Sequence, residues 1–254
     1  MNFKLSKSAM PTLIPQPPVI CEGTQFDMGV AQGRAFADRI FSGRKLLLHL
    51  EAFRLQQPRW MPYPVFRFIA ERKARSFMEP ALTDHADFLQ RLNGIQSGSG
   101  ASFGNLCLLN SLETALSSLG DCTVSLGGCS AMAVRGSRSA TGEPMIAKNF
   151  DYLPLVQPLY SLRKSEPTVG KRALEFTAAP LVGTIDGVNE SGLAITYNYA
   201  FTTDMQRAPA APISVVIAEA LRDCSTVAEA AQFIDSTPRC GGGILMLADR
   251  KSVV

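Results

Sequence analysis

Cys129 has the clearest chemical setting of any residue in this sequence. It follows Gly127 and Gly128, precedes Ser130, and stands where helical periodicity gives way to short strand-like segments. Glycine permits backbone geometries that other residues are denied, and a tightly turned Gly-Cys peptide is what self-cleavage requires. The thiol would attack the carbonyl carbon of Gly128, an N-to-S acyl shift would form a thioester, and water would release a new chain that begins at Cys129.

Such a cleavage would also create a base for later chemistry. A free α-amine has a pKa of about 8, and an N-terminal amine can activate its own side-chain nucleophile. The chain has only two histidines, His49 and His85, both in its first third. Two readings stay open at this point: a base made by cleavage, or a cysteine hydrolase of another kind that uses one of these histidines.

Composition excludes several classes of protein. The chain has 254 residues, 46% of them apolar, and a formal charge of +3. This is too apolar for a disordered chain, and the charge is too small for a nucleic-acid binder driven by electrostatics. The six cysteines form no Cys-x-x-Cys pair, and no apolar run approaches a signal core or the ~18 residues of a membrane span. We therefore expect a cytoplasmic protein with no bound metal, no nucleic-acid partner and no membrane span.

The first 120 residues are predicted to be mostly helical. After an extended lead-in over residues 1–20, Thr24 and Asp27 have the spacing of a capping box. Apolar residues then recur at helical spacing. The expected helices cover residues 27–53, 65–78, 83–95 and 106–119, with a loop over 97–104.

The pattern changes to strands after the paired glycines. We expect a hairpin from residues 130–135 and 145–152, and a turn over 189–192. Further strands are expected over 173–177, 181–188, 193–199 and 244–248, and helices over 213–222 and 226–234, the latter opened by Thr226 and Glu229. Strands linked by hairpins favour antiparallel pairing and an α+β domain over a doubly wound sheet.

Basic residues are concentrated in the helical half. Residues 1–128 hold 13 basic and 10 acidic side chains, and residues 129–254 hold 12 of each. This cluster could bind an anionic group such as the phosphates of a coenzyme, form a membrane-surface face, or be a solvated helix face. Much of the excess comes from Arg54, Arg59, Arg67, Arg72, Lys73 and Arg75.

Residues 128–152, with the sequence GCSAMAVRGSRSATGEPMIAKNFDY, resemble the nucleophile hairpin of the acyl-coenzyme A:6-aminopenicillanic acid acyltransferase family. That family consists of N-terminal-nucleophile hydrolases of the cysteine type. The strand ending Asn-aromatic-Asp-aromatic, here 149–152, is part of its pattern. The resemblance continues in consistent order over residues 22–40, 93–115, 182–201 and 224–249.

The resemblance implies a fold and a division of the chain. The fold would be a four-layer αββα sandwich of antiparallel sheets. Residues 21–128 would form the helical pro-segment, or α chain, and residues 129–254 the β chain, cut apart at Gly128–Cys129. Because family members usually continue past the strand matching 244–248, we also expect a C-terminal truncation, and no residue here takes the role of the family's active-site arginine.

The resemblance also implies roles for single residues. Cys129 would be the nucleophile, Asp151 would orient and stabilise the new ammonium group, and the Asn198 amide would donate to the oxyanion. Asn149 would be a second positioning amide. Three aromatic residues would line an acyl pocket: Phe150, Tyr152 and Tyr199.

The expected activity is acyl transfer through a Cys129 thioester. The substrate would be a small N-acyl amide or acyl thioester, and the acceptor would be water or an amine. No cofactor is expected, although acyl-coenzyme A is a candidate acyl donor. The partners expected are this substrate and the α and β chains of one precursor. The alternative to an enzyme is a non-catalytic or truncated relative that acts as a binding protein through its basic helical face.

Overall fold

The computed structural model describes residues 17–112, 127–152, 154–200 and 210–254. Residues 1–16 of the expected lead-in, residues 113–119 of the helix expected over 106–119, and Cys122 lie outside these described residues. The order of elements confirms an α+β protein, in which a first strand is followed by helices, then strands, then two helices and two final strands.

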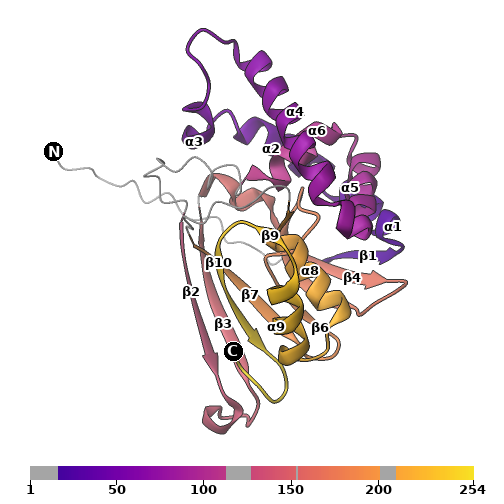
Figure 1. The fold of residues 1–254 in the computed structure, drawn as a ribbon, viewed down its shortest axis with the longest axis vertical. Helices are drawn as coiled ribbons and strands as arrows, with labels where there is room; N and C mark the ends of the chain where they lie inside the picture. Colours follow the sequence, from indigo (N-terminus) through magenta and orange to yellow (C-terminus); the bar gives the residue numbers. More distant parts are fainter. Residues whose placement is uncertain (1–16, 113–126, 153, 201–209) are drawn as a thin grey trace, which may run out of the picture.

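A six-stranded sheet forms the centre of the molecule (Figure 1). Neighbouring strands are antiparallel except for the first pair, where β1 runs parallel to β4 with Val19 beside Arg163. The extended lead-in expected over residues 1–20 runs into this strand at Val19 and Ile20. In spatial order the strands are β1 (Val19–Gly23), β4 (Tyr160–Pro167), β5 (Ala173–Ala178), β6 (Asp186–Asn189), β7 (Ala194–Tyr199) and β10 (Gly243–Ala248).

A long two-stranded ribbon accompanies the sheet. It consists of β2 (Gly127–Val134) and β3 (Met145–Tyr152), which pair antiparallel as the predicted hairpin, with a short turn of 3-10 helix, η2 (Gly136–Arg138), in the connection. A third pair, β8 (Ala211–Pro212) and β9 (Arg239–Cys240), is parallel. The prediction of purely antiparallel sheets is therefore wrong for two pairs of strands.

The N-terminal helices differ from the prediction in their breaks. The single helix expected over 27–53 is α1 (Gln25–Ala35), α2 (Ala37–Leu46) and the short α3 (Glu51–Arg54). Phe36 is the C-cap of α1, its backbone angles are not helical, and its side chain is buried. After these come α4 (Tyr63–Ala81), η1 (Thr83–His85), α5 (Ala86–Ser99) and α6 (Phe103–Asn110). Since α5 continues to Ser99, most of the loop expected over 97–104 is helix or helix cap.

Helices α1 and α5 contact each other backbone to backbone. A Cβ atom added at Gly29 would lie 2.2 Å from the carbonyl oxygen of Arg91, and one at Gly94 would lie 2.2 Å from that of Phe26. Cβ atoms added at Gly33 and Gly98, each four residues further on, would be almost as close to the opposite helix, at 2.5 and 2.3 Å from its carbonyl oxygens. Only glycine allows this approach, which holds the helices against β1 and β4.

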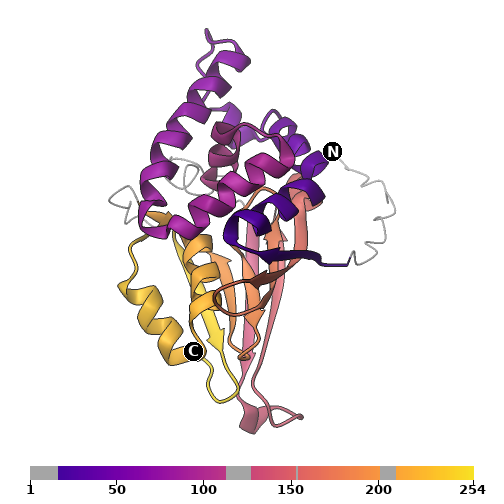
Figure 2. The same ribbon diagram turned by 90° about the vertical axis from the view of Figure 1, so that its right-hand side faces the viewer.

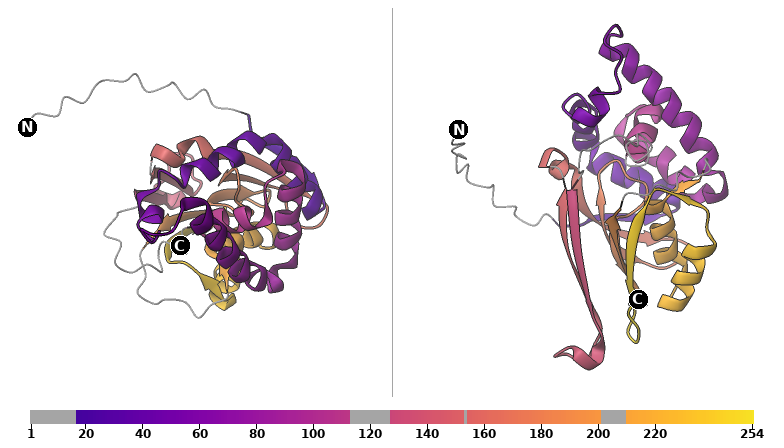
Figure 3. Two further views of the ribbon diagram at one scale, coloured as in Figure 1. Left: turned by 90° about the horizontal axis from the view of Figure 1, so that it is seen from above. Right: turned by 60° about the vertical axis from the view of Figure 1, so that its left-hand side comes forward.

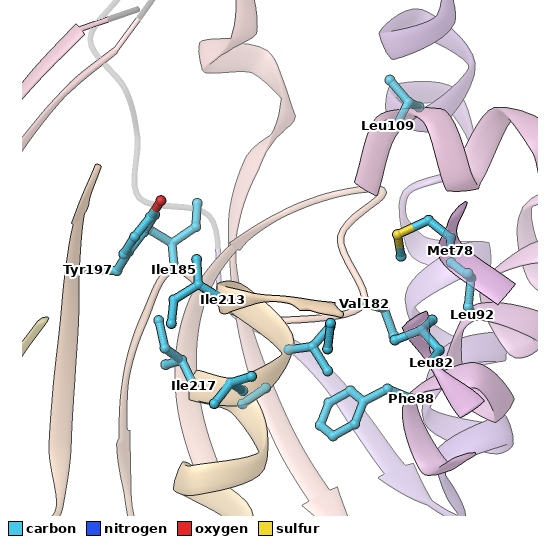
Figure 4. Close-up of a cluster of buried hydrophobic side chains, with 14 of the residues drawn as sticks. Met78, Leu82, Phe88, Leu92, Leu109, Val182, Ile185, Tyr197, Ile213 and Ile217 are labelled. Atoms are coloured by element: carbon cyan, nitrogen blue, oxygen red, sulfur yellow. The ribbon is translucent and has the colours of Figure 1, made fainter. Parts of the chain in front are cut away.

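Two later helices complete the core. They are α8 (Ile213–Asp223) and α9 (Val227–Ser236), and the predicted cap of α9 is confirmed, because the Thr226 side chain accepts from the Glu229 amide. Figure 4 shows Tyr197 and Ile185 pointing toward α8, and Phe88 lying near Val182 on the other side of that helix. Apolar side chains from the sheet and from both groups of helices thus share one core.

A buried ion pair ties α1 to the sheet. Arg163 of β4 is fully buried, and its guanidinium donates to both oxygens of Glu175 in β5, at 2.9 and 3.0 Å. It also donates to Gln32 of α1 at 2.7 Å. Ser165 donates to Glu175, and Arg91 of α5 donates to Ser165 at 2.9 Å. The network fixes the helices in register with the strands.

The described residues form layers of helices, sheet and ribbon. Seen from the side, α8 and α9 lie on one face of the β7–β10 region, and the ribbon lies on the other (Figure 3, right). The fourth layer of the expected sandwich stays a prediction. No helix within the described ranges has both the length and the apolar character needed to cross a membrane.

Candidate active site

Cys129 lies on the inner face of the ribbon. It is paired with Phe150 across the ribbon, and opposed residues of an antiparallel pair point to the same face. Because side chains alternate along a strand, Lys148 shares this face. The Lys148 ammonium reaches Asp186 of the central sheet, so the face that carries Cys129 is the one turned toward the sheet.

A pocket of about 120 Å³ contains Cys129 and lies where the strands of the ribbon and the sheet end together. Its lining is mostly apolar and comes from the ribbon, the sheet, α6, α8 and the short η3 (Pro154–Leu159). The Phe150 ring meets those of Tyr160 and Phe176 edge-on, with centroids 4.9 and 5.4 Å apart. Tyr199 also lines the pocket. Such a lining suits an apolar group of a substrate.

Cys129 is the most accessible of the five cysteines that the structure describes. It is partly exposed, whereas Cys21, Cys107, Cys224 and Cys240 are buried. Burial raises the pKa of Cys107 to about 12 and also raises the pKa of Cys21 and Cys224. Because the thiolate is the nucleophile, these three thiols are poor candidates for covalent chemistry.

Lys148, on the same face of the ribbon as Cys129, is a candidate residue that sequence reasoning missed. Its side chain is only 5% exposed, and its ammonium lies 2.8 Å from the Asp186 carboxylate. It also donates to the Tyr197 carbonyl oxygen and lies 4.9 Å from the centre of the Phe150 ring. The sequence held one signal for it, since Lys148 and Phe150 are two residues apart and must share a face of a strand.

Asn198 faces the ribbon from the central sheet. It lies two residues after Thr196, which is opposite Asp186 across β6 and β7, so all three side chains share one face. The Asn198 side-chain oxygen is buried and has no hydrogen-bond partner within the described part of the chain. Ribbon and sheet therefore place Asn198 and Cys129 on facing surfaces, but Asn198 does not line the Cys129 pocket.

Asp151 and Asn149 lie on the opposite face of the ribbon from the Cys129 thiol. Asp151 is exposed and is paired with Gly128, while Asn149 is exposed and is paired with Ser130. Asp151 is thus a direct neighbour of the Gly128–Cys129 backbone, but neither side chain lines the pocket. Tyr152 ends β3, and its side chain lies outside the described part of the structure.

Neither histidine lines the Cys129 pocket. His85 is buried, and its Nδ1 lies 2.7 Å from the Glu219 carboxylate of α8. His49 is exposed in the turn after α2. Within the ranges that the structure covers, no group of three His, Cys, Asp or Glu side chains could hold a metal ion.

Comparison with known families identifies one match. The model of the family described as acyl-coenzyme A:6-aminopenicillanic acid acyl-transferase matches residues 138–253 and confirms, over that range, the resemblance inferred from the sequence. The match includes Asn149, Asp151 and Asn198 and begins after Cys129. Among curated proteins, none matches the chain.

Proposed function

We propose that this chain, whose residues 138–253 match the model of the acyl-coenzyme A:6-aminopenicillanic acid acyl-transferase family, is an N-terminal-nucleophile amidohydrolase or acyltransferase of the cysteine type. The observation that carries the proposal is the position of Cys129. Cys129 is partly exposed, whereas the other cysteines that the structure describes are buried. It lines an apolar pocket at one end of the ribbon, and the ribbon faces the sheet that carries Asn198.

The first step is self-cleavage. The Cys129 thiol gives up its proton and attacks the Gly128 carbonyl carbon, and the C–N bond between Gly128 and Cys129 breaks as the thioester forms. The departing nitrogen takes a proton and becomes the α-amine of Cys129. Water then hydrolyses the thioester, which leaves the Gly128 carboxylate and restores the thiol. Pairing with β3 holds this peptide in place.

The second reaction is acyl transfer by the new N-terminus. The α-amine accepts the thiol proton, sulfur attacks the acyl carbonyl carbon, and the Asn198 amide donates to the resulting oxyanion. The leaving amine or thiol departs with the proton, and water or an acceptor amine then takes the acyl group from sulfur. Asp151, which pairs with Gly128 in the ribbon, would favour the ammonium form of the amine. Lys148 adds a buried positive charge on the Cys129 face.

The pocket favours an apolar acyl group in the substrate. Phe150, Tyr160 and Tyr199 contribute aromatic surface to it, and Leu109 and Ile213 contribute aliphatic surface. A small N-acyl amide or an acyl thioester, including acyl-coenzyme A, carries an acyl chain of this kind. The polar leaving group would remain at the open side of the pocket.

Two alternatives fit the geometry less well. A histidine-assisted cysteine hydrolase needs an imidazole beside the thiol, whereas His85 is paired with Glu219 and His49 is exposed outside the pocket. A non-catalytic binding protein needs no reachable thiol. Failure of a thiol-directed acyl probe to label Cys129 in the folded protein would favour that alternative.

Intact-mass measurement of the purified protein tests the proposal. We expect one chain of 128 residues and a second of the remaining 126 of the 254, beginning at Cys129. Cys129→Ala should stay a single chain. Cys240→Ala is the matched control, because Cys240 lines the same pocket, and it should be cut normally. If wild type and Cys129→Ala both remain intact, self-cleavage is wrong.

A further inference from the structure

Helix α4 is apolar on two sides. Its inner side packs into the core through Phe66, Ala70 and Met78. Its outer side carries Val65, Phe68 and Ile69, all exposed, at the spacing of one helical stripe. An exposed apolar stripe of this kind is typical of an interaction surface, and within the described residues the core covers only the inner side of the helix.

This outer stripe adjoins the connection between α3 and α4, which also exposes apolar side chains. The connection between α3 and α4, with the first turns of α4, projects beyond the other elements in two perpendicular views (Figures 1 and 2). That connection carries Leu55 and Trp60, and Trp60 is 80% exposed. We call the five side chains the tip patch: Leu55, Trp60, Val65, Phe68 and Ile69.

Basic side chains surround the tip patch. Residues 54–75 contain six basic side chains and one carboxylate, Glu71, a net charge of +5, although Arg67 pairs with Glu71 and Arg75 with Glu79 just beyond this segment. The whole chain carries only +3, so the rest of it sums to −2. The positive charge of the molecule is therefore concentrated on the projecting element that also exposes its apolar side chains.

The order of residues along α4 suits insertion into a lipid surface. Arg72 and Lys73 follow Val65 on the same stripe by seven and eight residues, and both are exposed. At 1.5 Å per residue this is about 10 Å along the helix axis. Interfacial elements bury their apolar side chains about 5–10 Å into the headgroup and acyl boundary. With the tip patch at that depth, Arg72 and Lys73 lie at the level of the lipid phosphates.

We propose that the tip patch and its flanking basic residues form a docking site for an anionic lipid bilayer. Charge complementarity favours this partner over a second copy of the chain, because pairing the same face in a symmetric dimer would bring two segments of +5 together. The site is separate from the Cys129 pocket, so the inference does not depend on the proposed chemistry.

Trp60 makes the test specific, because it is the only tryptophan in the chain. The full-length protein is mixed with vesicles of phosphatidylcholine alone, or of equal parts phosphatidylcholine and phosphatidylserine. We expect the Trp60 emission to shift to the blue with the anionic vesicles, and the protein to float with them, with little change for the neutral ones. Added salt should weaken both effects.

Matched variants separate the apolar and the charged contributions. Phe68→Ser/Ile69→Ser should lose the shift while keeping Trp60, whereas Val169→Ser, at an exposed apolar residue elsewhere, should keep it. Arg72→Gln/Lys73→Gln should weaken partitioning about fivefold for each charge removed. Arg135→Gln/Arg138→Gln removes two exposed charges from the ribbon and should change the partitioning onto anionic vesicles little. Circular dichroism checks that each variant is folded.

Two results would overturn the docking site. One is an unchanged Trp60 emission with anionic vesicles at low salt. The other is a blue shift that appears without vesicles and grows with protein concentration, which would show that this face binds a second copy instead. Intact-mass analysis of the same samples reports on self-cleavage separately.

Discussion

At the scale of single residues, Lys148 offers the sharpest prediction. It lies diagonally across the ribbon from Cys129, a separation of about 7 Å between such positions. At this separation the attraction between an ammonium group and a thiolate is worth about 2 kcal/mol at an effective dielectric near 20. The Asp186 carboxylate offsets part of this attraction. Lys148→Gln should therefore slow acylation of Cys129 by a thiol-directed acyl probe about tenfold.

Two variants show whether the charge itself matters. Lys148→Arg should restore most of the acylation rate, because it keeps a buried cation beside Asp186. Lys164→Gln removes a lysine that pairs with Glu166 on the surface, and its rate should match wild type. Equal rates in Lys148→Gln and wild type would limit Lys148 to a structural role.

Sequence reasoning could identify Cys129 but not Lys148. Two glycines and a change of periodicity set Cys129 apart in the sequence. A lysine in an alternating strand, by contrast, is usually solvated. Its burial follows only from the register that sets it over Asp186, a residue 38 positions away. The same register places Asp151 and Asn149 outward, which their positions in the Asn-aromatic-Asp motif did not indicate.

At the scale of elements, the contact between α1 and α5 leads to a second prediction. Gly94→Ala should lower the free energy of unfolding by about 1–3 kcal/mol, because its Cβ would overlap the backbone of α1. Gly43→Ala in α2 is the control, since its Cβ would meet side chains only at ordinary contact distance, 3.6 Å. That variant should gain about 0.5–1 kcal/mol in helix propensity. Urea unfolding measures both, and equal changes would contradict the close packing.

The buried ion pair of Arg163 in β4 with Glu175 in β5 leads to a third prediction. Burial alone would raise the pKa of Glu175, but Arg163 and its hydrogen bonds hold that pKa below its ordinary value. Glu175→Gln should lower the free energy of unfolding at pH 7 by about 3–5 kcal/mol, because it leaves the Arg163 charge buried without a counter-ion. Glu190→Gln, which breaks an exposed pair with Arg172, should change it little.

The same pair makes stability depend on pH. A carboxyl group whose pKa is lowered by folding contributes stability above its unfolded pKa, about 4.3 for glutamate. This contribution is lost as the pH falls through the lower, folded-state pKa. Wild type should therefore lose stability on acidification, and its advantage over Glu175→Gln should narrow. A constant difference between the two proteins from pH 7 to acid would contradict this assignment.

Most elements could be predicted from periodicity, and the exceptions have physical causes. The expected helix over 27–53 has its apolar residues in the core, with Met28, Phe36 and Ile40 all buried. Apolar residues at this spacing are compatible with one long helix or with three shorter ones. The breaks between α1, α2 and α3 could therefore not be predicted from the sequence. Strand β4 was missed because its residues include Arg163, Lys164 and Glu166. The strand expected over 181–188 is shorter, because only Asp186–Asn189 pairs with its neighbours.

At the scale of the whole molecule, the two halves of the chain share one sheet and one core. Strand β1 comes from the segment before Cys129 and pairs with β4 from the segment after it. If the chain is cut between Gly128 and Cys129 as proposed, the two resulting chains should therefore stay together. We expect them to elute as one species in native size-exclusion chromatography and to separate in denaturant. Separation under native conditions would show that the shared sheet does not hold them.

Strand order is the part of the fold that the sequence could not predict. The partner of Val19 is Arg163, far along the chain and with helices in between. A hairpin turn predicts that the strands on either side of it pair with each other, as β6 and β7 do, and those pairings were expected. A parallel pair between distant segments has no turn to mark it.

The pairing of β1 with β4 also determines how the molecule would recover from denaturation. In the uncut chain, residues 17–128 remain tethered to the rest, and refolding is a first-order process. Once Gly128 and Cys129 are separated, the same sheet must form between two molecules, so recovery becomes second order and fails on dilution. Cleavage would thus turn a reversible folding equilibrium into a structure that is assembled once, with Cys129→Ala as the form that still refolds at any concentration.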